Sequence, residues 1–340
     1  HAAMAAMDCA AQELGISREE LEDRIVPDLG FDERMERVFD YGPRTFTVRL
    51  APALQTEIYD ESGKRLKNMP MPGVHDDPEK APAASRDYKE MKKQLKTVVQ
   101  HQKQRFMQAL SGERLWKGAD WKRLFIKNPV MHRFAAGLIW GIYEQDSGHR
   151  LKKSFRYMED GSFNTAAEEE FALPEDGVVG LVHPLELPKE ELAAWKQQLA
   201  DYEVEQPICQ LERAVYLLEG EERDAFSLLR FQGKQLGRLP LFGRLERAGW
   251  LKGTPGDGGE IRSFYREDGA AGAMVEFSVC DVRHEEITEQ IGEVFFYRTG
   301  PADDAAKKRQ RYRLGEINPR YFSEIVLQIA EAVSDAAPAG

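Results

Sequence analysis

The chain has 340 residues, of which 42% are hydrophobic, and a formal net charge of −11 from 47 basic and 58 acidic residues. This size and apolar content suit about two ordinary globular domains. No run of about 18 uncharged apolar residues is present, so the composition excludes a membrane span.

Two further features of the whole chain concern its setting. The first residues have no initiating Met and no signal-peptide pattern, so we expect a segment cut from a longer polypeptide. Cys9, Cys209 and Cys280 lie far apart and are odd in number, which fits neither a disulfide framework nor a paired-cysteine zinc site. We therefore expect a reducing, cytoplasmic setting.

Helical signals open the chain. A first helix ends at Gly15, and the capping box formed by Ser17 and Glu20 predicts the start of a second. Period-two alternation then predicts an antiparallel meander, with strands at 45–50, 54–59 and 64–67. After a proline-rich linker, an apolar stripe at three-four spacing predicts one long helix over 85–110.

The next segments mix short helices and strands. We predict a short helix at 120–125 and another that begins at Asn128-Pro129, where the asparagine supplies a cap. Strands at 138–143 and 151–158 form a predicted hairpin, followed by a short apolar strand at 178–182 and a helix at 188–202. We place a domain boundary at Gln206-Pro207.

The second part reads as a sheet with two helices. Strands are predicted at 215–218, 226–231, 261–266, 273–279 and 293–299. Helices are predicted at 239–248 and after the Asn318-Pro319 cap. The predicted fold class is therefore α+β: residues 1–206 combine helices with short antiparallel strands, and residues 207–340 form an antiparallel sheet closed by a C-terminal helix.

Charge is distributed unevenly along the chain. Residues 159–206 contain 13 acids and two lysines and so carry a charge of −11, whereas residues 86–105 carry +5. A second basic run, 307–313, has five cations in seven positions. Such segregation either steers a charged partner or draws two parts of one chain together.

Several strings of residues resemble the bacterial family described as domain of unknown function 4132. They lie at 128–134, 137–141, 158–164, 180–185, 206–207, 211–213, 264–269 and 319–325. Members commonly have a helical-repeat region ahead of this part, so the resemblance implies the C-terminal portion of a larger protein. Some members are labelled molybdate-metabolism regulators and carry a WGR domain, but here Trp140-Gly141 is followed by Ile142 in place of Arg. The resemblance implies no catalytic residues.

His183 is the best single candidate for acid–base chemistry. It ends an apolar strand close to Glu186, and an imidazole titrates in the useful range. Arg156 and Asp160 join it in a candidate pocket if the strand at 151–158 pairs directly beside 178–182. The alternative is that His183, which precedes Pro184, has a structural role at a bend.

Other suggestive motifs favour structural roles. The glycines at 253–259 are followed by Glu260, where a phosphate loop needs Lys, so we interpret them as a turn. We expect a buried Cys280 and an exposed His284 in place of half a metal site, and we place His132 at the edge of the core. We predict no metal site and no cofactor.

The strongest surface feature is the basic side of the long helix. The candidate partner-binding residues share a positive charge within the two basic runs. They are Lys89, Lys92, Lys93, Lys96, Lys103 and Arg105, then Lys307, Lys308, Arg309 and Arg311. The alternative is a solvated face or one paired with the chain's own acidic segment.

Three functional hypotheses follow. The first is a non-catalytic interaction or regulatory module of a larger cytoplasmic protein, which binds another protein or the N-terminal part of the same chain. The second is an enzyme with a pocket around His183. The third is a nucleic-acid-binding module that uses 86–105 and 307–313.

Overall fold

The protein consists of two compact units. The computed structural model describes residues 2–112, 114–145, 150–256, 258–269, 271–283, 286–299 and 310–336. Unit 1 comprises His1–Ala109 and Arg114–Glu212, and unit 2 comprises Leu110–Glu113 and Arg213–Gly340. Helices and three antiparallel sheets within the described ranges confirm the α+β class. No helix in this part of the chain is both long and apolar enough to cross a membrane.

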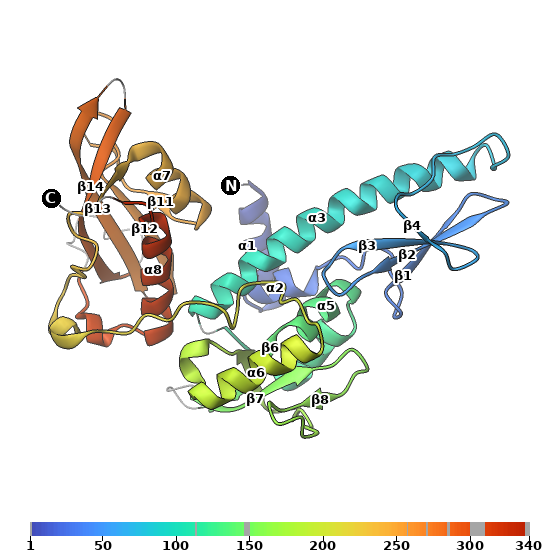
Figure 1. The fold of residues 1–340 in the computed structure, drawn as a ribbon, viewed down its shortest axis with the longest axis horizontal. Helices are drawn as coiled ribbons and strands as arrows, with labels where there is room; N and C mark the ends of the chain where they lie inside the picture. Colours follow the sequence, from blue (N-terminus) through green and yellow to red (C-terminus); the bar gives the residue numbers. More distant parts are fainter. Residues whose placement is uncertain are drawn as a thin grey trace. The chain divides into compact units, whose positions relative to one another are not determined.

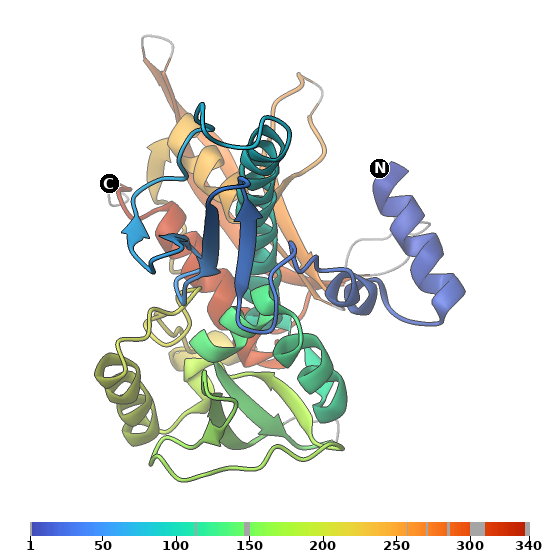
Figure 2. The same ribbon diagram turned by 90° about the vertical axis from the view of Figure 1, so that its right-hand side faces the viewer.

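Unit 1 begins with the two predicted helices, α1 (Ala2–Leu14) and α2 (Arg18–Arg24). The predicted capping box is present, because the Ser17 hydroxyl accepts from the Glu20 N–H at 3.1 Å and the Glu20 carboxylate accepts from the Ser17 N–H at 3.0 Å. Figure 2 shows α1 projecting from the rest of unit 1 and joined to it through α2.

Sheet A is the predicted meander with one additional strand. Its order is β1 (Glu36–Asp40), β2 (Thr45–Leu50), β3 (Thr56–Asp60) and β4 (Arg65–Leu66), all antiparallel. Strand β1 was not predicted. Its inward residue Phe39 pairs with Phe46 in register, and both side chains are buried.

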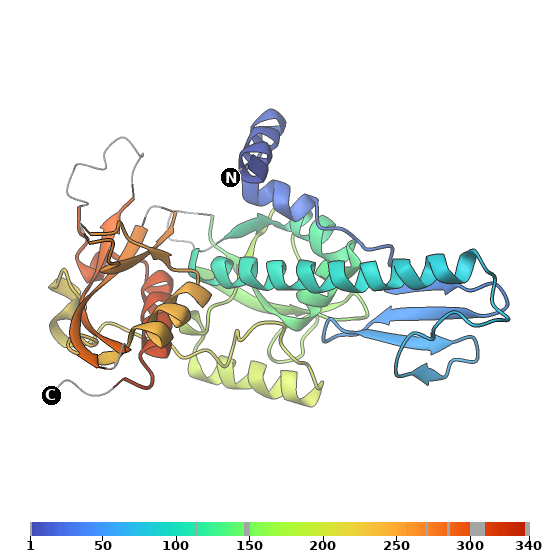
Figure 3. The same cartoon turned by 90° about the horizontal axis from the view of Figure 1, so that it is seen from above.

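Helix α3 (Lys80–Gly112) is the predicted long helix and begins five residues before 85. Pro82 lies in its first turn, where the missing N–H has no intrahelical partner to lose. Tyr88 packs edge to face on Phe39 at 5.6 Å between ring centroids, and Phe106 packs on Phe134 at 5.0 Å. Figure 3 shows α3 running beside sheet A at one end and continuing past it at the other.

Sheet B forms the centre of unit 1. Its strands, in spatial order, are β5 (Leu115–Lys117), β9 (Val178–Leu181), β6 (Ile139–Tyr143), β7 (Leu151–Tyr157) and β8 (Phe163–Asn164). Trp140 of β6 pairs with Phe155 on one side and Leu181 on the other. Strand β6 therefore separates β7 from β9, and the pairing that was the condition for the candidate pocket does not occur.

The two faces of sheet B are covered differently. One face carries aromatic side chains, and α4 (Gly118–Trp121), a π-helical turn (Lys122–Ile126) and α5 (Pro129–Gly137) supply rings to the same cluster. The single short helix predicted at 120–125 is thus α4 followed by the π-turn. Helix α6 (Lys189–Asp201) packs on the opposite face, where Trp195 joins Ile139 and Val182 in a small apolar cluster.

Unit 2 is an antiparallel sheet with two helices on one face. The strands of sheet C, in order, are β10 (Gln235–Gly237), β14 (Glu286–Arg298), β13 (Ala271–Arg283), β12 (Ser263–Asp268) and β11 (Leu251–Lys252). Helices α7 (Arg238–Arg247) and α8 (Pro319–Ala332) pack on it, as Figure 1 shows. The core joins Phe264 and Phe296 of the sheet to Phe322 and Ile325 of α8.

Two predicted strands of unit 2 do not form. Residues 215–218 and 226–231 belong to no named strand, and only Ser227 makes an isolated bridge, to Phe295. The hairpin of β13 and β14 is longer than predicted because it continues past the core, where Val279 and Val282 are exposed. Short 3₁₀ turns occur at Pro184–Glu186, Gly220–Asp224 and Leu314–Glu316.

Candidate functional site

Helix α3 places five lysines on one exposed face. We call Lys89, Lys92, Lys93, Lys96 and Lys103 the basic ridge; all five are exposed. At about 100° per residue they fall within an arc of about 100° around the helix. The opposite face carries the buried stripe, which includes Tyr88, Met91 and Leu95. The backbone periodicity therefore separates the charged face from the packed one.

The basic ridge forms no ion pair with any residue that the structure describes. Among the described residues, none supplies a carboxylate within ion-pair distance of these five lysines. The acidic segment 159–206 is fully described, and its ion pairs go elsewhere: Glu159 pairs with Arg133. The two acids beside the ridge are also engaged, since Asp87 binds Arg37 and Glu90 accepts from Gln94. Within the described ranges the ridge is therefore not paired with the acidic segment, and the alternative of a solvated face stays open.

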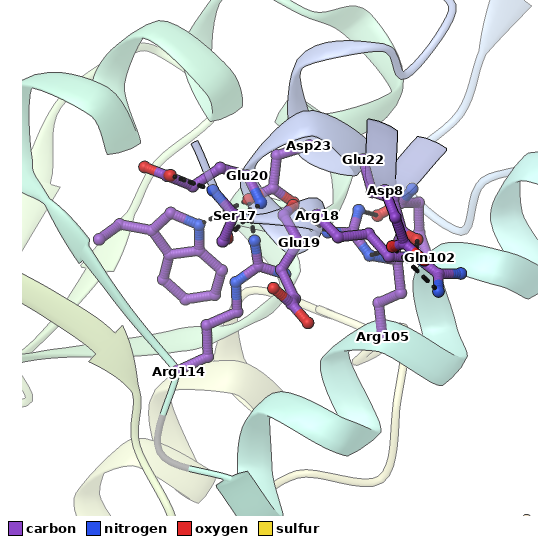
Figure 4. Close-up of polar contacts among 11 residues, drawn as sticks. Asp8, Ser17, Arg18, Glu19, Glu20, Glu22, Asp23, Gln102, Arg105 and Arg114 are labelled. Atoms are coloured by element: carbon purple, nitrogen blue, oxygen red, sulfur yellow. Dashed lines mark hydrogen bonds and ion pairs between the residues drawn. The ribbon is translucent and has the colours of Figure 1, made fainter. Parts of the chain in front are cut away.

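Arg105, which the sequence placed with the ridge lysines, is buried and faces the interior. Its side chain is 7% exposed and binds α2 (Figure 4). The Nη2 atom lies 2.7 Å from Asp23 Oδ1 and donates to the Glu19 carbonyl at 2.8 Å, while Nε lies 3.2 Å from Glu22 Oε2. Arg105 is therefore a packing residue and does not belong to the exposed candidate surface.

Asp23 is the centre of this buried cluster, which we call the Asp23 hub. Besides Arg105, Arg114 Nη2 lies 2.6 Å from Asp23 Oδ2, and the Trp116 indole N–H donates to the same oxygen at 2.9 Å. Burial lowers the pKa of Arg114, and the charge of Asp23 opposes that effect. The hub fixes α2 to α3 and β5, a structural role that no local sequence signal indicated.

The structure describes only part of the second basic run. Lys307, Lys308 and Arg309 lie outside the described residues. Arg311 makes internal contacts: its Nη2 lies 2.8 Å from Glu293 Oε2, and its guanidinium lies 3.8 Å from the Phe295 ring centroid. Arg311 is thus engaged within unit 2.

His183 is fully buried and caps a 3₁₀ turn. Its Nδ1 atom accepts from the Leu185 N–H at 3.1 Å, and its backbone N–H donates to the Glu186 carboxylate at 2.9 Å. The Tyr143 hydroxyl donates to the same carboxylate at 2.8 Å. These contacts fit the structural alternative, in which the residue stabilises the bend before Pro184.

The other members of the candidate pocket have separate environments. Asp160 is exposed in the turn after β7, where its carboxylate accepts from the N–H and hydroxyl of Ser162. Arg156 is 3% exposed and lies on the α6 side of sheet B. Because β6 lies between β7 and β9, the pairing on which this candidate pocket rested is absent.

His132 is buried as expected for the core. Its Nδ1 lies 3.4 Å from the Tyr157 hydroxyl, and burial, followed by the charge of Arg133, lowers the pKa of its imidazole. A neutral imidazole at neutral pH follows from that direction.

The remaining motifs have structural explanations or corrections. The glycine loop closes as a turn, with the Gly256 N–H donating to the Glu260 carbonyl at 2.9 Å. Cys280 is exposed, so the expectation of a buried thiol is wrong, because β13 has already left the core at that point. His284 lies outside the described residues. Within the described ranges, no group of three or more His, Cys, Asp or Glu residues is arranged to hold a metal ion.

Sequence reasoning missed one unusual site beneath α6. Nη1 of Arg156, Oδ1 of Asn164 and Oε1 of Gln198 are buried and have no hydrogen-bond partner. Only the alternation of β7 offered a signal, since it places Arg156 on the face opposite Phe155. The covering helix is distant in sequence and could not be assigned to that face.

Comparison with known proteins supports the family resemblance, and the quoted strings from 128 to 213 lie within the matched residues, whereas those at 264–269 and 319–325 lie outside them. The family described as "Domain of unknown function (DUF4132)" matches residues 63–250. The "Uncharacterized protein YehI" of Escherichia coli (strain K12) is 37% identical over 247 residues, which cover 73% of this chain. The match covers 20% of that relative, so the chain spans about a fifth of its length. No solved structure matches significantly. On the extent of these matches, the chain belongs to the DUF4132 family.

Proposed function

We propose that this chain is a non-catalytic interaction module whose basic ridge binds an acidic protein segment. The segment belongs to another protein or to another part of a longer polypeptide that contains this chain. One observation carries the proposal: Lys89, Lys92, Lys93, Lys96 and Lys103 share one exposed face of α3, and no carboxylate of the described chain pairs with them.

The chemistry of the ridge favours a flexible acidic segment over a packed protein surface. Side chains near the lysines include Gln94, Gln100 and Gln104, all exposed, and supply no aromatic anchor. Lysine ammonium groups are hydrated point charges, and stable protein interfaces rely on buried aromatic and Arg side chains. Lys89, Lys96 and Lys103 recur every seven residues, or about every 10.5 Å along the helix. An extended acidic chain can follow such a row without a matching apolar surface.

The three glutamines near the lysines offer no aromatic ring, which also argues against single-stranded nucleic acid. Binding of single strands generally uses aromatic side chains on which bases stack. Nucleic acid is therefore the alternative outcome of the experiment below.

Three finer predictions accompany the proposal. Cysteine usage favours a cytoplasmic setting, and Cys9, Cys209 and Cys280 form no disulfide. The family resemblance implies a place in the C-terminal portion of a larger protein. It also implies a likeness to those members that are labelled molybdate-metabolism regulators.

A charge-reversal experiment tests the proposal. The variant with Lys92→Glu, Lys93→Glu and Lys96→Glu should bind a fluorescein-labelled oligoglutamate peptide at least about tenfold more weakly than the native chain, because reversal turns attraction into repulsion. Fluorescence anisotropy at low ionic strength measures the dissociation constant. Native binding should also weaken when the salt concentration rises, since exposed charges are screened.

The matched control changes the same net charge elsewhere. Lys64, Lys67 and Lys152 are exposed and, in the described part of the chain, make no ion pair, so their replacement by Glu should leave peptide binding near the native value. Equal weakening by both triple variants contradicts the proposal. A labelled DNA duplex that binds more tightly than the peptide, and loses affinity only in the ridge variant, assigns the ridge to nucleic acid.

A further inference from the structure

Arg156 carries a buried guanidinium that forms no ion pair with any described residue. It is 3% exposed, and no described residue supplies a carboxylate within ion-pair distance of it. Its Nη1 atom has no hydrogen-bond partner, and its Nε reaches only the Ala136 carbonyl, at 3.4 Å. The ring of Tyr202 also lies over the guanidinium, with its centroid 5.3 Å from Cζ.

This arrangement is costly for the isolated chain. An arginine stays protonated even when burial lowers its pKa, as burial does for Arg156. Buried charges in proteins are ordinarily paired, because removal from water is repaid only by an opposite charge or strong hydrogen bonds. Other inward-facing arginines of unit 1 follow that rule: Arg105 binds Asp23, and Arg133 binds Glu159.

Two unsatisfied acceptors lie in the same neighbourhood. Arg156 and Asn164 are cross-strand partners of β7 and β8, so their side chains share a face of sheet B. Gln198 of α6 donates to the carbonyl of Thr165, the residue after Asn164, while its own Oε1 has no partner. Helix α6 covers this face, because Trp195 donates to Ser154 of β7 at 2.7 Å.

We propose that Arg156, Asn164 and Gln198 form a binding site for a small carboxylate that also carries a hydroxyl or amino group. The carboxylate would bind the Arg156 guanidinium, and the hydroxyl or amino group would donate to the two amide oxygens. A single guanidinium matches a monoanion. A phosphate dianion suits the site less, because it would face two acceptor oxygens with no second cation and with Glu159 nearby.

Tyr202 lies beside Arg156 at the end of α6. It is the C-cap residue of α6, the residue is 48% exposed, and its ring lies over the guanidinium. Water is the competing occupant, since it can satisfy the three atoms but cannot neutralise the charge.

Thermal unfolding of the full chain tests the site with glycolate as the probe. At constant ionic strength, replacement of chloride by glycolate at about ten times its dissociation constant should raise the unfolding midpoint of the native chain by about 3 °C. Acetate has the carboxylate and lacks the hydroxyl, so it should produce a smaller rise. Arg156→Met should abolish both responses.

Two further variants keep the test decisive. Arg133→Met removes an arginine that already has its own carboxylate, so the glycolate response should persist in that variant. If Arg156→Met does not fold, Arg156→Lys retains the charge without the planar fork and should give a response below the native one. A native response no larger than that of the Arg156 variants overturns the proposal, and so does a crystal structure grown in glycolate that shows only water at the three atoms.

Discussion

Replacement of Asp23 by Ala should remove the strongest polar link between α2 and the rest of unit 1. The Asp23 side chain is 3% exposed, and its carboxylate contacts Arg105 at 2.7 Å, Arg114 at 2.6 Å and the Trp116 indole at 2.9 Å. Removal of one partner from a buried pair costs about 3–5 kcal/mol. Arg105 keeps Glu22 at 3.2 Å, so we expect the lower end, about 3 kcal/mol.

Urea unfolding followed by tryptophan fluorescence measures this loss. With a slope of about 2 kcal/mol per molar urea, the midpoint should fall by about 1.5 M. Asp8→Asn is the matched control, because Asp8 is 59% exposed, lies 3.8 Å from Arg18 and should leave the midpoint unchanged. Combining Asp23→Ala with Arg105→Met in a double-mutant cycle should give a coupling energy above about 1 kcal/mol. Coincident midpoints for the Asp23 and Asp8 variants would refute the reasoning.

Two further predictions concern acid stability and backbone packing. The pKa of Asp76 is lowered to about 2, chiefly by the Arg44 guanidinium. The ionised carboxylate therefore stabilises the fold fully above its unfolded pKa of about 4, and this contribution is lost as the pH falls toward 2. Asp76→Asn should make stability depend less on pH in that range, measured by circular dichroism, and an unchanged dependence would contradict this. A Cβ on Gly118 would lie 2.0 Å from the Pro174 carbonyl oxygen, so Gly118→Ala should lower the free energy of unfolding by about 1–3 kcal/mol, measured with urea. In α7 a Cβ on Gly243 would lie 3.8 Å from Arg247 Nη1, so Gly243→Ala should instead raise it by up to about 1 kcal/mol, and similar effects of the two variants would count against the packing argument.

Helix starts were predictable because their signals are local. Ser17, Asn128 and Asn318 each accept from backbone N–H groups within three residues, as their sequence positions indicated. Such a cap depends on a few neighbouring residues and not on the rest of the fold. The α+β class followed from these helices together with the alternating segments between them.

Strand partners were not predictable in the same way. The hairpin that pairs Trp140 with Phe155 was predicted because its two strands are neighbours in sequence. The pairing of Trp140 with Leu181 joins segments far apart in sequence, and the pattern of each strand does not identify this partner. The segments at 215–218 and 226–231 have strand-like composition but no continuous ladder partner. Alternation predicts a strand's faces, and tertiary packing decides its neighbours.

The candidate surface was partly predictable, and its one clear error has a physical cause. The lysines of the basic ridge are exposed where the helical period placed them, whereas Arg105 was assigned by residue type. Met91 and Arg105 are fourteen residues apart, two heptads, so they share a face of α3, and both are buried. The helical periodicity therefore predicts that the side chain at position 105 faces the interior. By contrast, the unsatisfied atoms near Arg156 depend on a covering helix that no local pattern identifies.

Because α3 is fixed at two places, its length sets the rotation of one attached part of unit 1 relative to the other. Its first half is fixed to sheet A through Tyr88 and its last turns to the aromatic core through Phe106, within one continuous helix of 33 residues. One residue inserted between the two contacts would rotate sheet A by about 100° about the helix axis relative to the aromatic core. Seven inserted residues would bring sheet A back to within about 20° of its original orientation and move it about 10 Å along the axis. The helix thus acts as a spacer in which an insertion of seven residues nearly preserves the orientation of sheet A, whereas an insertion of one residue does not.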